Sequence, residues 1–272
     1  MVDQFLLFLA GLAGGFIAGL LGIGGGMVFI IVLPFALLEI GVPESEIVQY
    51  TIANSLFGTF FASLSGNITH VRTKTFYLRE VLYIGISGAV ASILFLEYVV
   101  NTPYYSKTIF NVFLIVFLGF LLIRSFIIKD KEGSQGKTKR NPLIVSGSLA
   151  GAVSSLSGLG GGTVVIPMLN NYFRFDVKKA KSISIGMILI STGANVIYNM
   201  NTTPMYDIDY YNYGYIVMPI AISLSLGVML AAPIGVMTSL RMSSKTLKLV
   251  FAIFVGMIIV DKGIELISML WD

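Results

Sequence analysis

The chain has 272 residues, of which 56% are hydrophobic and only 12% are charged, and its mean hydropathy is +0.86. This composition excludes a water-soluble domain and predicts that the chain lies in a lipid bilayer. The sequence has no cysteine, which excludes disulfides, thiolate metal sites and cysteine catalysis. Lys and Arg number 18 against 14 Asp and Glu. In a membrane protein we interpret this excess as a topology signal, and we predict no nucleic-acid partner and no cofactor.

Apolar runs follow one another along the chain, and most have the length of about 20 residues that a membrane-spanning helix needs. They lie at residues 5–38, 47–69, 81–100, 108–128, 142–169, 182–200, 213–240 and 246–270. The first run is not expected to be a signal peptide, because Asp3 and no basic residue precedes it and because the run is too long. The pattern predicts an all-α polytopic membrane protein of the cell inner (plasma) membrane.

The first and fifth runs are interrupted by the same glycine-rich motif. Residues 21–29 read LGIGGGMVF, and residues 156–164 read LSGLGGGTV. Each glycine inside a helix costs about 1 kcal/mol relative to alanine, so three consecutive glycines predict a break in each helix. The motif is not a dinucleotide fingerprint, because no strand is predicted before it and GIGGGM lacks the last glycine.

The two motifs also mark an internal repeat. When GIGGG (residues 22–26) is aligned with GLGGG (residues 158–162), SKTIFNVFLI at residues 106–115 corresponds to SKTLKLVFAI at residues 244–253. The charged segment KDKEGSQGKTKRN lies between the two halves. We therefore predict a first transmembrane repeat at residues 1–128, a linker at residues 129–141 and a second transmembrane repeat at residues 142–272.

The loop charges predict that the two repeats have opposite orientations. In the first half, the loop at residues 39–46 has no basic residue, whereas the next loop holds Arg72, Lys74 and Arg79. In the second half the order is reversed, because residues 174–181 hold four basic residues and residues 201–213 hold none. Basic loops face the cytoplasm, so the two halves are inverted relative to each other.

This inversion requires an odd number of crossings in each half. The number becomes odd if each glycine-rich segment enters and leaves on the same side of the membrane. The predicted fold is therefore two inverted-topology repeats, each a broken glycine-rich helical hairpin plus three transmembrane helices. Both termini are expected outside and the linker in the cytoplasm, with Lys107 as the one basic residue in an outer loop. The alternative, eight straight spans, would place the linker and the basic loop at residues 174–181 on opposite sides.

Broken helices at membrane depth predict a cavity, because their backbone polar groups need protein or water as partners. New helices would begin at about Gly26 and Gly162, with unpaired N–H groups and positive dipole ends in the membrane interior. Such ends bind anions, and two opposed hairpins would bring them together near the midplane. The expected ligand is a small anion. The glycines expected to let it approach the backbone are Gly24, Gly25, Gly26, Gly160, Gly161 and Gly162.

Small hydroxyl and amide side chains near the motifs could orient the anion without adding buried charge. They are Thr51, Asn54, Ser55, Ser191, Thr192 and Asn195, together with Ser157 and Thr163 beside the second motif. Hydrogen bonds between helices, with no ligand, are the alternative role for each of them. No Lys, Arg or His is placed at the centre of a predicted span, so neutral donors and helix dipoles are expected to bind the anion.

Other features have a simpler interpretation. The glycine pairs in GFIAG (residues 15–19) and GSLAG (residues 147–151) are expected to serve close helix packing. His70 is expected on the surface of a loop. Glu97, Asp261 and Glu265 fall within or near predicted helix ends; a proton relay is the alternative role for them, but residues this close to an interface are expected to be solvated.

The glycine motifs resemble those of a known family. GGFIAGLLGIGGGMVFI and its second copy GSLAGAVSSLSGLGGGTVVIPML are similar to the TauE/SafE family of sulfite exporters, also called the toluene sulfonate uptake permease family. The proline that this family carries soon after the glycines is Pro167 in the second copy and Pro34, further along, in the first. The resemblance implies a transporter of sulfur-containing anions such as sulfite, sulfoacetate or other organosulfonates.

These observations predict a membrane transporter that moves a small anion by alternating access. An anion channel, or a permease for another small oxyanion or carboxylate, is the alternative on the same scaffold. An intramembrane enzyme is disfavoured, because no His, Cys or paired carboxylate is placed for catalysis. The expected partners are the anionic substrate and the lipid bilayer, and a homo-oligomer is compatible with the sequence.

Overall fold

The computed structural model describes residues 3–127, 140–206 and 208–271. Within these ranges the helices are α1 (Gln4–Leu21), α2 (Gly26–Glu39), α3 (Ile47–Arg72), α4 (Leu78–Phe95) with its π-helical continuation η1 (Leu96–Val100), α5 (Lys107–Ile127), α6 (Arg140–Ser157), α7 (Gly162–Asn171), α8 (Val177–Asn201), α9 (Met218–Arg241) and α10 (Ser244–Trp271). Two short strands, β1 (Asn212–Tyr213) and β2 (Ile216–Val217), pair antiparallel. The all-α fold is thus confirmed, while the predicted linker lies outside the described residues up to residue 139.

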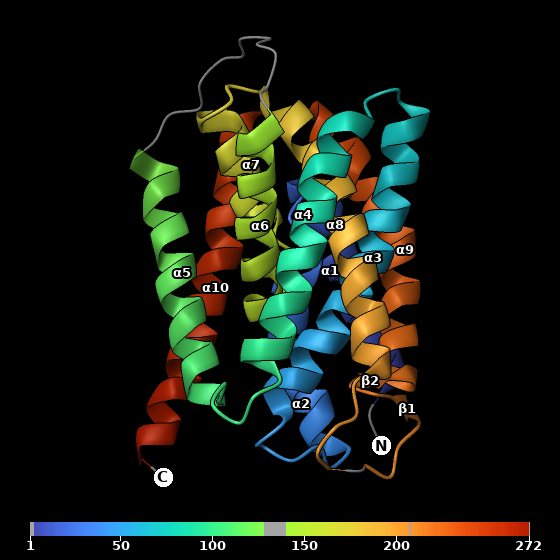
Figure 1. Ribbon diagram of the computed structural model, residues 1–272, viewed down its shortest axis with the longest axis vertical. Coiled ribbons are helices and arrows are strands. Elements are labelled where there is room, and N and C mark those ends of the chain that lie inside the picture. The colour runs from blue at the N-terminus through green and yellow to red at the C-terminus, as the bar shows by residue number, and fades with distance from the viewer. Residues whose placement is uncertain (1–2, 128–139, 207, 272) are drawn as a thin grey trace.

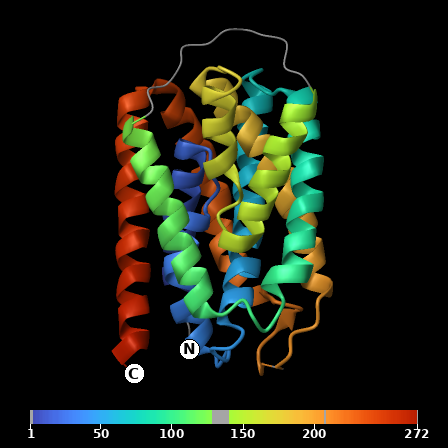
Figure 2. The same ribbon diagram turned by 60° about the vertical axis from the view of Figure 1, so that its left-hand side comes forward.

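The helices run roughly along a common long axis (Figure 1). At one end of the bundle α1 begins, α10 ends and the β-hairpin lies; we call it the termini end. At the opposite end α5 finishes and α6 begins; we call it the linker end. α5 and α10 pack together at one side of the bundle (Figure 2). Among the described residues, five helical segments are long and apolar enough to cross a membrane, namely α1, α4 with η1, α5, α8 and α9.

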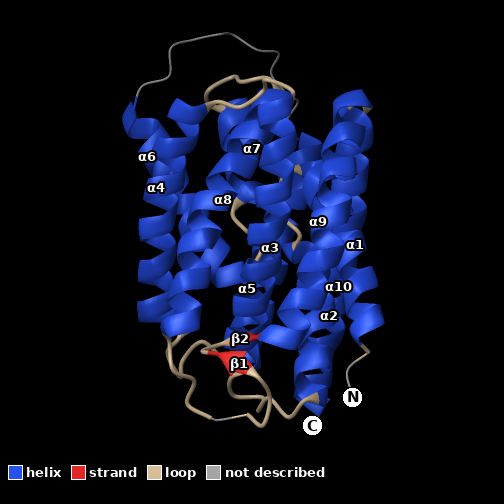
Figure 3. Cartoon of the chain, turned by 90° about the vertical axis from the view of Figure 1, so that its right-hand side faces the viewer, coloured by secondary structure: helices blue, strands red, loops and turns tan. Residues whose placement is uncertain are grey.

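Two helical hairpins enter the bundle from opposite ends. α1 and α2 start and finish at the termini end, whereas α6 and α7 start and finish at the linker end (Figure 3). Their glycine-rich breaks lie in the middle of the molecule, where Figure 3 draws them as loops. The second helices of the hairpins begin at Gly26 and Gly162, so the predicted helix starts are confirmed.

Each hairpin is anchored to a long helix by glycines. α1 packs along α9, and α6 packs along α4. A Cβ built at Gly15 would lie 2.6 Å from the Val228 backbone, and one built at Gly151 would lie 2.0 Å from the carbonyl oxygen of Gly88. The packing role predicted for GFIAG and GSLAG is confirmed, because a side chain at these positions would push the helices apart.

Two predicted loop residues instead lie inside helices. α3 continues to Arg72, so His70 is buried, with Nδ1 2.8 Å from the Thr75 hydroxyl; the predicted surface position was wrong. Lys181 was also predicted to lie in a loop, but it is buried in α8. The cause is that the Asp176 side chain accepts a hydrogen bond from the N–H of Lys178 at 3.1 Å. This cap starts α8 ahead of the apolar run.

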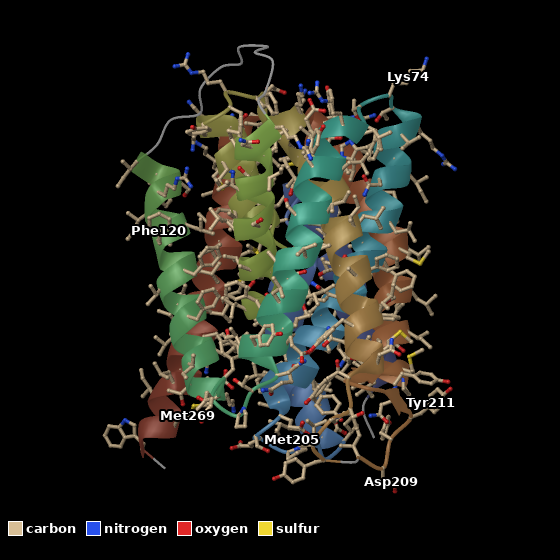
Figure 4. The ribbon with its side chains drawn as sticks, in the orientation of Figure 1. Lys74, Phe120, Met205, Asp209, Tyr211 and Met269 are labelled. Atoms are coloured by element: carbon tan, nitrogen blue, oxygen red, sulfur yellow. The ribbon has the colours of Figure 1, made fainter. Side chains whose placement is uncertain are left out.

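The termini end is closed by a loop that a buried carboxylate holds in place. Glu46 accepts hydrogen bonds from the N–H groups of Met205 (2.8 Å) and Tyr206 (3.1 Å) and from the hydroxyl of Tyr215 (2.8 Å). Burial, together with this bond to Glu46, raises the pKa of Tyr215, so its hydroxyl stays a neutral donor. Figure 4 shows Tyr211 of this loop at the termini end, and Lys74 at the opposite end.

Candidate functional site

The two breaks begin with the same backbone geometry. Gly22 (φ 74°) and Gly158 (φ 71°) adopt the left-handed conformation directly after α1 and α6. Their N–H groups donate to the carbonyl oxygens of Ala18 and Ser154, each at 2.8 Å. Glycine adopts this conformation without steric cost, so the repeated motif ends both helices in the same way.

The breaks also touch each other, although one motif belongs to each half of the sequence. A Cβ built at Gly26 would lie 2.3 Å from the carbonyl oxygen of Gly158. Reciprocally, a Cβ built at Gly162 would lie 2.6 Å from the carbonyl oxygen of Gly22. The glycines that open α2 and α7 therefore let two backbones meet at the centre of the bundle, where any side chain would collide with the opposite break.

A threonine that the sequence pattern did not single out lies between the two breaks. A Cβ built at Gly24 or at Gly160 would lie 2.7 Å from Cγ2 of Thr59. Thr59 is fully buried, and its hydroxyl has no hydrogen-bond partner among the described residues. The sequence could have indicated Thr59 by its position four residues after Ser55, which places both side chains on the same face of α3.

Each break is held by a serine of one of the two central helices. Ser55 of α3 donates to the carbonyl oxygen of Gly158 at 2.8 Å, and Ser184 of α8 donates to that of Gly22 at 2.9 Å. The hydroxyl proton of Ser55, a predicted ligand, is therefore used within the protein. Ser184 was missed, although it plays the same part for the first break.

The helices that follow the breaks begin without side-chain caps. Their first N–H groups have no partner within the helix, which leaves a positive dipole end at each N-terminus. Beside the N-terminus of α7, the buried Thr163 has a hydroxyl with no partner among the described residues. The corresponding residue of α2 is the apolar Met27. Of the two helix N-termini, only that of α7 therefore carries a hydroxyl side chain of its own.

A cavity of 140 Å³ opens beside this N-terminus, on the linker side of the breaks. One water molecule needs about 10–15 Å³ by the same measure, so the cavity has room for a small polyatomic ion. Gly162 and Thr163 line it, and so do Ile23 of the first break and Pro167 of α7. Two of the predicted site residues thus face a common space.

Three basic side chains from three helices reach the same cavity. They are Arg124 of α5, Lys181 of α8 and Lys248 of α10, and no acidic residue of the described chain lines the cavity. Lys181 is only 6% exposed, and its ammonium donates to the carbonyl oxygen of Leu20 at 3.0 Å. Because Coulomb attraction is stronger in a poorly solvated interior, this lining favours an anion. Neutral donors and helix dipoles were expected at the site from the sequence, and the structure adds basic side chains from positions near helix ends to the cavity lining.

Other predicted ligands have partners within the protein. The Asn54 amide donates to the carbonyl oxygens of Tyr50 (2.8 Å) and Tyr215 (3.0 Å) and accepts from the N–H of Val217 (3.0 Å). It therefore joins α3 to β2. Ser157 donates to the carbonyl oxygen of the preceding turn at 2.6 Å and accepts from the N–H of Leu159 at 3.2 Å. It stabilises the second break from within.

The predicted site residues of α8 make hydrogen bonds to α4 or to the backbone of α8 itself. Asn195 accepts a hydrogen bond from Ser92 of α4 at 2.7 Å. Ser191 and Thr192 donate to the carbonyl oxygen of Ile188, at 3.3 Å and 2.6 Å. Thr51 of α3 lines a separate, much smaller pocket towards the termini end. The structure thus places Gly162 and Thr163 at one cavity with the three basic side chains. Thr51, Ser191, Thr192 and Asn195 do not line that cavity.

Known proteins are similar to this sequence over nearly its whole length. The family model described as sulfite exporter TauE/SafE matches residues 7–261. The chain belongs to the TauE/SafE family. A probable membrane transporter protein of Methanocaldococcus jannaschii is 31% identical over 256 residues, which are 92% of each chain. A probable membrane transporter protein of Haemophilus influenzae is 27% identical over 94% of this chain and 96% of its own length.

A third relative, the probable membrane transporter protein YunE of Bacillus subtilis, is 22% identical over 95% of this chain and 98% of its own length. The relatives are named as transporters and not as enzymes. This TauE/SafE protein is accordingly a multi-pass membrane transporter, as the sequence predicted.

Proposed function

We propose that this TauE/SafE transporter carries a small sulfur-containing oxyanion, such as sulfite, sulfoacetate or another organosulfonate, by alternating access. The observation that carries the proposal is that the α7 N-terminus, Thr163 and Lys181 line one cavity. All three are hydrogen-bond donors suited to oxyanion oxygens. The family description supports the sulfur chemistry, and the cavity supports the charge and the size.

The donors explain how an anion would be both held and released. Lys181 uses one ammonium proton on the carbonyl oxygen of Leu20, which leaves two for a ligand. Leu20 is the next-to-last residue of α1, so the same lysine connects a bound anion to the first break. The Lys181 ammonium is already engaged with Leu20, so it holds an anion less tightly than a free bidentate guanidinium would, and this favours release.

Alternating access is supported by the arrangement of the hairpins. We propose that residues 1–128 and 142–272 are inverted repeats that rock against each other about the contact between the breaks. The basic linker end is proposed to face the cytoplasm and both termini the outside of the plasma membrane. The described state, with its cavity on the linker side, is then the cytoplasm-facing state.

Exchange measurements on purified protein in proteoliposomes test the substrate and the mechanism. Sulfite, sulfoacetate, taurine, thiosulfate and sulfate are supplied outside, with or without the same anion inside. We expect saturable uptake of at least one of them, accelerated by the anion on the opposite side. Flux that neither saturates nor accelerates would favour the channel alternative. Transport of a carboxylate or a cation, with none of the sulfur anions, would overturn the proposed substrate.

Lys181→Met tests the position of the site. Loss of a charge-assisted hydrogen bond worth about 1.5–3 kcal/mol should weaken binding of the transported anion by tenfold or more. Lys178→Met is the matched control, because Lys178 is an exposed lysine of the same helix. Wild-type affinity in a folded Lys181→Met protein would show that the anion binds elsewhere.

Cysteine labelling tests the proposed orientation, since the sequence contains no cysteine. Ser45 and Lys178 are exposed residues at opposite ends of the bundle. A membrane-impermeant maleimide should label Ser45→Cys in intact cells and Lys178→Cys only after permeabilisation. Labelling of both from one side would contradict the topology.

A further inference from the structure

A second polar pocket lies on the termini side of the breaks, between α2, α3, α5 and α10. Its volume is 10 Å³, roughly the space of one water molecule. Pro34 of α2, Thr51 of α3 and Asn111 of α5 line it. So do three charged side chains, Lys107, Lys262 and Glu265. The pocket is therefore much smaller than the linker-side cavity and, unlike that cavity, has a carboxylate among its described lining residues.

Two of its side chains are buried without partners. Thr51 is 1% exposed, and its hydroxyl has no hydrogen-bond partner among the described residues. Asn111 is 0% exposed, and neither its amide nitrogen nor its amide oxygen has such a partner. Buried polar groups in native proteins are nearly always hydrogen-bonded, so two unpartnered side chains lining one pocket mark a place where a small polar ligand would find hydrogen-bond partners.

The charged residues of the pocket are arranged around one carboxylate. One oxygen of Glu265 lies 2.9 Å from the ammonium of Lys262, and the other lies 3.0 Å from the ammonium of Lys107. Lys262 is 2% exposed and also pairs with Asp261 at 3.1 Å. Glu265 thus presents two oxygens to two ammonium groups, as a bound oxyanion would.

The two ends of the protein differ at this carboxylate. The register that aligns Ser106 with Ser244 also aligns Arg124 of α5 with Lys262 of α10. Arg124 lines the linker-side cavity and Lys262 lines the termini-side pocket, so a basic residue recurs at both ends. In the same register Glu265 corresponds to Ile127, which is exposed. Among the described residues, a carboxylate therefore lines the small termini-side pocket, and none lines the larger linker-side cavity.

From this geometry we propose that Thr51, Asn111, Lys107 and Lys262 form a second anion subsite at the termini end, which the Glu265 carboxylate occupies in the described state. The proposal rests on the proposed function, because the ligand is an oxyanion of the transported class. An anion arriving from the termini side displaces Glu265 from the two lysines, and the pocket widens. The Thr51 hydroxyl and the Asn111 amide then donate to the anion. When the anion leaves, Glu265 again neutralises the lysines and this end closes.

Glu265→Gln tests the proposal from both sides of the membrane. Exchange of sulfite, with sulfoacetate as a second probe, is measured in right-side-out and inside-out vesicles. Loss of the competing carboxylate should raise the apparent affinity at the termini side by about tenfold, as expected for one charged hydrogen bond. The affinity at the linker side should not change. Glu44→Gln is the matched control, because exposed Glu44 lies 3.9 Å from Lys107 and carries the same charge. It should change neither affinity by more than about twofold.

Thr51→Val provides the second measurement. The Thr51 hydroxyl has no partner to lose within the described protein, so folding should be preserved while affinity at the termini side falls by about fivefold. Suppose that the wild type transports the anion but that Glu265→Gln and Thr51→Val leave the affinity unchanged at both sides. Glu265 is then only an ion-pair link between α5 and α10. That result overturns the subsite alone. A wild type that carries no sulfur oxyanion overturns the proposed function, and the subsite with it.

Discussion

The two glycine breaks share a backbone, but they differ in chemistry. Both end a helix with a left-handed glycine, and both are held by a serine of a central helix. After the shared start they diverge, because Gly25 is right-handed (φ −75°) whereas Gly161 is left-handed (φ 78°). Only the second break presents its helix N-terminus and a threonine to the large cavity. The repeat therefore supplies the architecture twice, whereas the candidate site needs one copy.

The largest expected effect is a difference in stability between variants of the two breaks. Gly161→Ala should lower the free energy of unfolding by about 2 kcal/mol or more, because a left-handed non-glycine residue costs about 1–2 kcal/mol. Its Cβ would also lie 2.5 Å from the carbonyl oxygen of Ala150. Gly25→Ala needs no unusual φ, and its Cβ would meet the side chain of Phe29 at 2.7 Å and no backbone atom closer than 3.4 Å; we expect a smaller loss of about 1 kcal/mol.

Thermal unfolding in detergent measures this difference. Gly256→Ala in α10 is the control, because a Cβ there meets no atom within 4 Å and alanine favours the helix. Equal losses at Gly161 and Gly25 would contradict the asymmetry of the breaks.

A smaller effect is expected on binding. Thr163→Val removes the unpartnered hydroxyl and should weaken binding of the transported anion by about fivefold, the effect of one neutral hydrogen bond of about 1 kcal/mol. Stability should not fall, because that hydroxyl has no partner to lose among the described residues. Met27→Leu changes the corresponding residue of the first break with little change in volume, and should leave binding within about twofold. Equal weakening in both variants would show that the anion contacts both breaks.

Much of the fold could be predicted from the sequence, because the signals were local. Three consecutive glycines break a helix wherever they occur, and the positions of the new helices at Gly26 and Gly162 followed directly. The packing of GFIAG and GSLAG also followed, because small residues at helical spacing allow helices to approach closely. The division into two repeats with a cytoplasmic linker remains a prediction.

The candidate site could be predicted only in part, because it depends on contacts between distant residues. Gly162 and Thr163 were found from the motif beside them. Lys181 was missed because it precedes the apolar run that begins at residue 182 and was therefore assigned to a loop. The cap at Asp176 starts the helix before that run, so Lys181 lies within α8. Asn54 was predicted as a ligand, but the N–H of Val217 donates to its amide oxygen. The two residues are far apart in sequence, so no local pattern shows this contact.

The smallest expected effect tests whether the breaks are held independently. Ser55→Ala and Ser184→Ala each remove one hydrogen bond to a break carbonyl, and each should cost about 1 kcal/mol of the free energy of unfolding. Because Gly26 packs on Gly158 and Gly162 packs on Gly22, loosening one break also loosens the surface on which the other rests. The double variant should therefore depart from the sum of the single variants by at least about 0.5 kcal/mol, the coupling typical of contacting residues. Strict additivity in thermal unfolding would instead show that α3 and α8 fix the breaks separately, and that their mutual contact contributes no coupling.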